Sequence, residues 1–195
     1  MSRFHQFLVA CGALLLLGLY FLPMWRITLE APQYPKGNEL AVEIHINDVR
    51  GARKNDLQNL NGLNHYIGMK KIEPDAIPEL TYMPAIVAGM IALGLVAAVS
   101  RKRWLVASWL IVVVIIGAIG LYDFYLWEYD YGHDLDPHAA IKIEGMAYQP
   151  PLIGSQQLLN FTAHSYPAIG FYFIIVGWLL GAWAWWSSRK NEVAS

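Results

Sequence analysis

Four uninterrupted apolar segments constrain this chain more than any other feature of its sequence. They cover about Gln6–Trp25, Met83–Ser100, Trp104–Tyr122 and Pro167–Trp186, and none of them contains an Asp, Glu, Lys or Arg. A helix of about 18–20 residues crosses a hydrocarbon core of about 30 Å. Only 15% of the chain is charged, against about 25% in an ordinary soluble domain. The sequence therefore predicts a protein that crosses a membrane four times.

The predicted fold class is an all-α integral membrane protein with four transmembrane helices and a small mixed extracytoplasmic cap made by two long loops. The first segment reads as a retained signal anchor, because its apolar run is long and ends in the bulky Leu22–Trp25 without a small-residue cleavage site. The predicted parts are the first span at 1–25, the first loop at 26–82, spans two and three at 83–122 with a turn at 101–103, the second loop at 123–166, and the last span with its tail at 167–195.

The basic residues predict the orientation. The two ends of the chain and the 101–103 turn carry six basic residues against one acidic residue, whereas the two long loops carry eight basic and fourteen acidic residues. Since short cytoplasmic segments are enriched in Lys and Arg, both termini are expected in the cytoplasm of a bacterial cell, with the loops outside its inner membrane. The acidic exterior suits cations and argues against a nucleic-acid partner.

The loops contain enough periodic sequence to form local structure. Apolar and polar residues alternate over residues 40–47, which predicts a half-buried strand. Leucines and isoleucine recur at helical spacing after Asn55 up to a stop at Gly68, which predicts a helix. Ser155 is expected to cap a short interfacial helix over Gln156–Ala163.

The candidate chemistry of the loops depends on His and Met, because the single cysteine, Cys11, lies inside the first span. If the helix after Asn55 reaches Met69, then His65 and Met69 share one face at i and i+4. An imidazole beside a thioether suits copper, and Cu(I) in particular. The competing interpretation is that Met69 only fills the core, as methionine usually does.

The second loop offers further ligands, and polar neighbours offer support. Met146 and His133 are the predicted completing ligands, while His138 and His164 remain alternatives at this point. Asn61, Asn64 and Tyr66 are expected to support the site by hydrogen bonding.

Several segments resemble a family of small, largely uncharacterised bacterial membrane proteins that is associated with gene neighbourhoods for nitrous-oxide reductase maturation and copper delivery. The resemblance covers both loops and lies in Leu63–Met69, Leu135–Pro137, Gly145–Gly154 and Leu158–Phe161. It implies copper handling on the outer face, with His65, Met69 and Met146 inside the matching segments. His133 is proposed from the residue pattern alone.

The resulting hypothesis is a non-catalytic copper-handling or maturation factor that binds Cu(I) outside the membrane and assists an exported cuproenzyme or its assembly factors. No nucleophile elbow, phosphate-binding glycine loop, HExxH or paired-cysteine motif is present in the sequence. One alternative is an accessory subunit of a membrane respiratory complex, with the loops as its docking surface. Another is a quinone-binding redox enzyme that uses Gln156 and Gln157.

Overall fold

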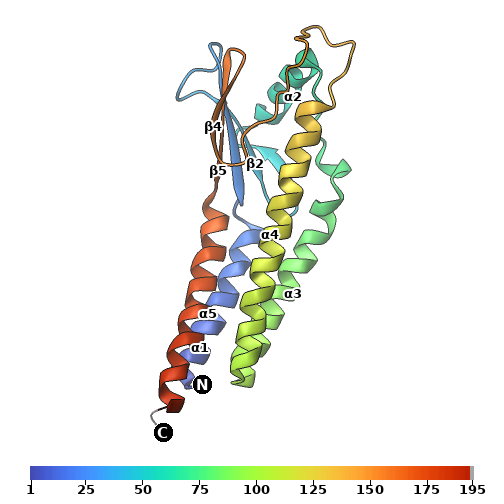
Figure 1. Ribbon diagram of the computed structural model, residues 1–195. Coiled ribbons are helices and arrows are strands. Elements are labelled where there is room, and N and C mark those ends of the chain that lie inside the picture. Colours follow the sequence, from blue (N-terminus) through green and yellow to red (C-terminus); the bar gives the residue numbers. More distant parts are fainter. Residues whose placement is uncertain (194–195) are drawn as a thin grey trace.

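The computed structural model describes residues 1–193 of the chain, and the side chains of residues 1–189. Within this part, four helices are long and apolar enough to cross a membrane. They are α1 (Arg3–Leu15), which continues as the 3-10 helix η1 (Leu16–Tyr20), α3 (Pro78–Ser100), α4 (Arg103–His133) and α5 (Ile169–Val193) (Figure 1). The prediction of four apolar spans is confirmed.

Small residues let these helices pack closely. At the crossing of α1 and α5, a Cβ placed on Gly12 would lie 2.5 Å from the carbonyl oxygen of Gly177. The Trp109 ring of α4 fills the space next to Gly94 of α3 and Gly181 of α5. Its indole Nε1 donates to the Met90 carbonyl oxygen over 3.0 Å. Membrane helices associate in this way because close backbone approach maximises van der Waals contact.

The all-α fold class is wrong, because a five-stranded antiparallel sheet forms at one end of the helices. Its strand order is β3-β2-β1-β5-β4, so the central strands come from opposite ends of the chain. The strands are β1 (Trp25–Glu30), β2 (Leu40–Ile44), β3 (Val49–Gly51), β4 (Gly154–Leu158) and β5 (Phe161–Pro167). Residues 40–44 confirm most of the predicted strand. We use "the cap" for the sheet, the helix α2 (Asp56–Ile67) and residues 134–153.

The helix predicted over Gln156–Ala163 is also wrong, because this segment is the β4–β5 hairpin. Leu158 pairs with Phe161 across a two-residue turn, and Leu159 takes a positive φ of 57° there. Every second residue of β5 faces inward, so Ala163 and Ser165 are buried while the residues between them face outward. The mixture of leucines with Gln and Asn in this segment is also typical of an amphipathic helix, but the segment buries one of its faces as a strand instead.

The sheet is continuous with two of the membrane helices. β1 begins five residues after η1 ends, and β5 ends two residues before α5 begins. The Ala168 N–H donates to the Met24 carbonyl oxygen, and the Gly170 N–H donates to the Pro23 carbonyl oxygen. Since β1 pairs with β5 and α1 packs against α5, the pairing of the two spans extends directly into the cap (Figure 1).

Helix α2 covers the inner face of the sheet and ends as predicted at Gly68. Gly68 adopts the left-handed conformation with φ 82°, and the Met69 N–H donates to the Asn64 carbonyl oxygen over 2.9 Å. These features form a Schellman-type helix end. The short 3-10 helix η2 (Pro74–Ala76) then leads the chain into α3.

Candidate functional site

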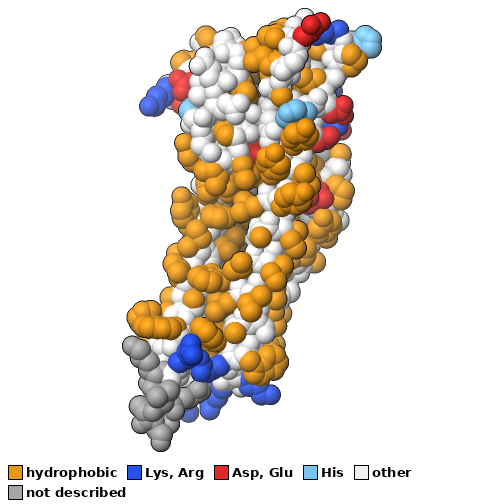
Figure 2. Space-filling view, in the orientation of Figure 1, with side chains coloured by type: hydrophobic (Ala, Val, Ile, Leu, Met, Phe, Trp, Pro, Cys, Tyr) orange, Lys and Arg blue, Asp and Glu red, His pale blue; other side chains and the backbone are white. Residues whose placement is uncertain are grey.

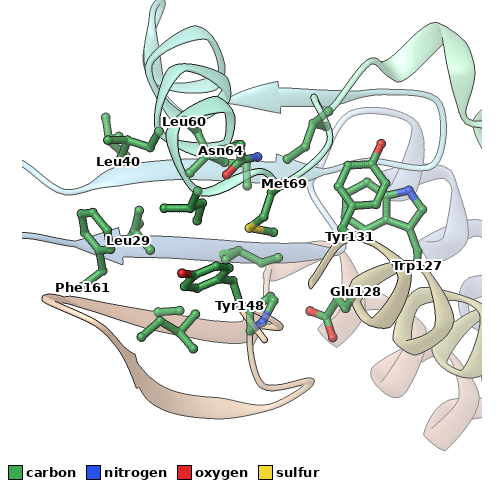
Figure 3. Close-up of a pocket in the computed structure, with 18 residues that line it drawn as sticks. Leu29, Leu40, Leu60, Asn64, Met69, Trp127, Glu128, Tyr131, Tyr148 and Phe161 are labelled. Atoms are coloured by element: carbon green, nitrogen blue, oxygen red, sulfur yellow. The ribbon is translucent and has the colours of Figure 1, made fainter. Parts of the chain in front are cut away.

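An apolar cavity of about 90 Å³, which we call the upper cavity, lies between the inner face of the sheet, helix α2 and the end of α4 nearest the cap (Figure 3). Ile27 and Leu29 of β1 face it beside Val42 and Leu40, their cross-strand partners on β2. Period-two alternation places these four side chains on one face of the sheet. The remaining walls come from α2, from the hairpin, and from residues of the segments between them and of α4, namely Met69, Ile72, Trp127, Glu128, Tyr131, Tyr148 and Pro150.

Two polar side chains on the wall of the upper cavity lack partners. Glu128 is 1% exposed and Tyr148 is 3% exposed. Within the described residues, the two carboxyl oxygens of Glu128 and the hydroxyl group of Tyr148 have no hydrogen-bond partner. Buried polar groups are nearly always satisfied, so each exception calls for an explanation. These two residues are the part of the candidate site that the sequence analysis did not single out.

A glycine on α4 positions Tyr148. A Cβ on Gly132 would lie 2.5 Å from the backbone nitrogen of Gln149, so only glycine permits the 148–150 segment to rest on the helix. The Tyr148 N–H donates to the Gly132 carbonyl oxygen over 2.9 Å. This contact places Tyr148 on the wall of the cavity. Elsewhere on the wall, the Trp127 ring stacks on the Tyr131 ring, with ring centroids 4.1 Å apart.

His65 and Met69 do not have the helical relation that the sequence suggested. Because α2 ends at Ile67 and Gly68 reverses the chain, the i and i+4 relation no longer applies and the expected common helical face is not formed. Met69 lines the upper cavity, where its thioether lies above the Tyr148 ring (Figure 3). His65 is exposed on α2. The expectation of a shared helix face was therefore wrong.

The two ligands predicted from the second loop, His133 and Met146, do not line the upper cavity. The exposed His133 ring stacks on Tyr129 with centroids 3.9 Å apart, and its Nδ1 lies 2.9 Å from the Tyr129 carbonyl oxygen. Met146 is half-buried in the 134–153 segment, where its N–H donates to the Ile143 carbonyl oxygen. Of the four predicted ligands, the upper cavity therefore contains Met69 alone.

The three predicted supporting residues, Asn61, Asn64 and Tyr66, form hydrogen bonds with backbone groups of neighbouring segments. The Asn61 side chain donates to and accepts from the Ile72 backbone, at 3.0 and 2.8 Å. Asn64 is buried on the wall of the upper cavity, and its amide donates to the Lys70 carbonyl oxygen. Tyr66 is exposed, and its carbonyl oxygen accepts from the Ile141 N–H over 2.9 Å.

A second cavity, of about 180 Å³, lies between the sheet and the membrane helices, and we call it the lower cavity. Three methionines line it, namely Met24 after η1 and Met83 and Met90 on α3. The buried His45 and the carboxylates Glu79 and Asp123 also line it. Trp127 belongs to the walls of both cavities. The sequence placed Met24 and Met83 near the outer ends of their spans, but it gave no sign that they line the same cavity.

His45 is held as a neutral base. Its side chain is 2% exposed, and its Nε2 accepts from the Arg50 Nε over 3.0 Å. Burial, and then the positive charge of Arg50, lower the pKa of His45, while Glu43 and Asp48 oppose this change. The imidazole therefore stays uncharged at neutral pH.

This lowered pKa predicts a loss of stability in acid. The unfolded chain takes up a proton on His45 near its ordinary pKa of about 6.5, whereas the folded protein takes it up only at lower pH. The unfolded state thus binds more protons, and the free energy of unfolding falls as pH drops below about 6.5. Thermal unfolding at pH 7.5 and 5.5 should show a smaller acid shift for His45→Gln than for wild type. His138→Gln, which alters an exposed histidine, should keep the full shift, and an unchanged shift in His45→Gln would contradict the account.

The outer face of the sheet has a serine, a histidine and a carboxylate in line. Ser155 Oγ lies 2.6 Å from His164 Nδ1, and His164 Nε2 lies 3.7 Å from Glu30 Oε2. None of these residues lines either cavity. We interpret them as cross-strand contacts between β4, β5 and β1. Gln156 and Gln157, the residues proposed for quinone binding, are exposed on β4 and also lie outside both cavities.

Comparisons with known proteins give no assignment: no family model, no curated protein and no solved structure matches this chain. Among the described residues, no group of three or more His, Cys, Asp or Glu side chains is arranged to hold a metal ion. Methionine thioethers form a separate class of ligand, which suits soft metal ions such as Cu(I).

Proposed function

We propose that this protein is a membrane-anchored, non-catalytic copper-handling factor that binds Cu(I) in the lower cavity and assists an exported cuproenzyme. The cap would lie outside the cytoplasmic membrane of a bacterial cell, with both termini inside. Figure 2 supports this orientation, since basic side chains gather at the end of the helices opposite the cap, while acidic and histidine side chains lie over the cap. An excess of basic residues favours the cytoplasmic side.

The observation that carries the proposal is the grouping of Met24, Met83 and Met90 around one cavity. Three of the six methionines of the chain thus line a single space beneath the cap. Thioethers are soft ligands and select Cu(I) over harder cations. A methionine group also withstands conditions that oxidise thiols, and Cys11 does not line this cavity.

This assignment replaces the ligand set predicted from the sequence. Met69 lies in the upper cavity, and His65, His133 and Met146 lie outside both cavities. The neutral His45 is the one imidazole on the wall of the lower cavity within the described residues. Its Nε2 is occupied by Arg50, so the thioethers are proposed as the primary ligands.

Competition for Cu(I) against a chromogenic chelator tests the proposal on the purified full-length protein. The variant Met24→Leu with Met83→Leu and Met90→Leu should bind Cu(I) at least about tenfold more weakly, since even outer partners of a metal site contribute about 10–100-fold. Leucine conserves the volume of methionine and usually costs less than about 1.5 kcal/mol in a core, so the fold should survive.

The matched control for this experiment changes the residues predicted from sequence. Met69→Leu with Met146→Leu and His65→Ala should retain the wild-type affinity. Loss of binding in this control, together with unchanged binding in the lower-cavity variant, would restore the predicted ligands. Absence of stoichiometric Cu(I) binding by the wild-type protein would remove copper from the account.

A separate observation favours the accessory-subunit alternative. Tyr66, Ile141 and Ile143 are about half exposed or more in the cap, and a backbone hydrogen bond joins Ile141 to Tyr66. Exposed apolar groups outside the membrane are typical of protein contacts. A stable complex that is recovered with and without copper, and is lost when Ile141 and Ile143 are changed to Ser, would support this role over copper handling.

A further inference from the structure

The Glu128 carboxyl group in the upper cavity is not used by the proposed copper site. It lies on α4 next to Trp127, almost fully buried, and both of its oxygens lack a hydrogen-bond partner within the described residues. Figure 3 shows it at the end of the cavity nearest α4, and Tyr148 and Met69 line the same cavity. A buried carboxyl group without partners is costly unless a ligand satisfies it.

The basic residue that contacts this end of α4, Lys70, is already engaged with other carboxylates. Lys70 Nζ lies 2.8 Å from Asp130 Oδ2 and 2.8 Å from Asp134 Oδ2. These two carboxylates raise the pKa of Lys70, so the ammonium group stays charged. Asp130 and Asp134 thus have a cation of their own, while Glu128 faces the apolar interior of the cavity instead.

The other walls of the upper cavity indicate which chemical group could lie next to the one that contacts Glu128. Apart from Asn64 they are aliphatic and aromatic side chains and the Met69 thioether, and Leu29, Leu40, Leu60 and Phe161 surround the end away from Glu128 (Figure 3). A cavity of about 150 Å³ admits a benzene ring, and this one measures about 90 Å³. The space therefore fits a short aliphatic chain better than an aromatic ring.

The charge of the surroundings favours a cation over an anion. The two long loops carry fourteen acidic and eight basic residues. Their combined field attracts cations toward the cap, and a carboxylate is an acceptor of charge-assisted hydrogen bonds.

We propose that the upper cavity is a binding site for a primary alkylammonium group. Glu128 receives the ammonium group, and the short chain lies along the leucines and Phe161. Binding of this group is independent of copper, because none of the three methionines of the lower cavity lines the upper cavity.

Calorimetric titration of the full-length protein in detergent micelles tests the proposal with three probes. n-Butylammonium carries both the chain and the charge, butan-1-ol carries the chain alone, and methylammonium carries the charge with almost no chain. Wild type should bind n-butylammonium at least tenfold more tightly than either of the other probes. Equal binding of n-butylammonium and butan-1-ol, or no binding of n-butylammonium, would overturn the proposal.

Two carboxyl substitutions locate the effect. Glu128→Gln keeps the shape of the side chain and should reduce n-butylammonium affinity about tenfold while leaving butan-1-ol binding unchanged. Glu144→Gln removes the same charge from an exposed position of the cap and should leave all three affinities unchanged. Equal losses in the two variants would attribute the preference to the general acidic field and overturn the assignment to Glu128.

A third variant tests the aliphatic part of the site without altering the carboxyl group. Met69→Phe places a larger side chain in the upper cavity and should abolish n-butylammonium binding, with Cu(I) binding retained. Retained n-butylammonium binding in this variant would place the ligand elsewhere. A loss of Cu(I) binding by the lower-cavity methionine variant, with n-butylammonium binding intact, would separate the two proposals.

Discussion

Replacing Gly177 by leucine is expected to abolish the folded protein. A Cβ at this position of α5 would lie 2.5 Å from the carbonyl oxygen of Gly12 on α1, a distance that only a displacement of one helix can relieve. Overpacking in a dense core typically costs about 1–3 kcal/mol, and more where backbone must move. Since β1 and β5 continue from these two spans, the displacement also disturbs the central pair of the sheet.

The measurement for Gly177→Leu is the yield of monodisperse protein after mild detergent extraction, followed by its thermal unfolding. Gly89→Leu is the matched control, because nothing lies within 4 Å of a Cβ built on this exposed glycine of α3. The control should be extracted and should unfold like wild type. If Gly177→Leu behaved like Gly89→Leu, the close contact between α1 and α5 would be disproved.

Replacing Trp109 by alanine should cost about 3–5 kcal/mol of unfolding free energy, as is typical when a large aromatic side chain is removed from a core. The ring is 1% exposed and fills the space that the missing side chains of Gly94 and Gly181 leave open. Its hydrogen bond to the Met90 carbonyl oxygen is lost as well. The void would lie where α3, α4 and α5 meet, next to the methionine on the wall of the lower cavity.

Chemical unfolding monitored by circular dichroism measures this loss for Trp109→Ala. Trp104→Ala is the control, because Trp104 lies on the same helix but is largely exposed. It removes an equal volume without leaving a cavity and should change stability far less. Similar losses in the two variants would show that Trp109 does not occupy the core of the bundle.

The local pattern of the chain was enough to predict the helices and some of the cap. Long apolar segments without charges must be helical to satisfy their backbone in lipid, so the four spans follow from the sequence. The strand at 40–44 and the helix ending at Gly68 follow from periodicity and from the conformational freedom of glycine. These features depend on neighbours in the chain alone.

The sheet was missed because its central pairing joins segments that lie far apart in sequence. Trp25–Glu30 alternates apolar and polar residues over six positions, a signal that could have predicted β1. The hairpin 154–167 has no comparable alternation that separates it from a helix, and its strand conformation depends on hydrogen bonding to β1. Propensity yields to such tertiary pairing, since each strand is stabilised by its partners.

The chemistry of the two cavities shows the same division. The sequence by itself determined that the chain has four apolar spans, a single cysteine inside the first of them, and histidines and methionines gathered toward one end. The tertiary structure alone decided which residues share a cavity: Met24 lines the lower cavity with Met83 and Met90 of α3, and Met69 lines the upper cavity with Glu128 and Tyr148. The reason is physical, because side-chain identity is encoded locally, whereas burial and proximity arise from contacts between residues that are distant in the chain.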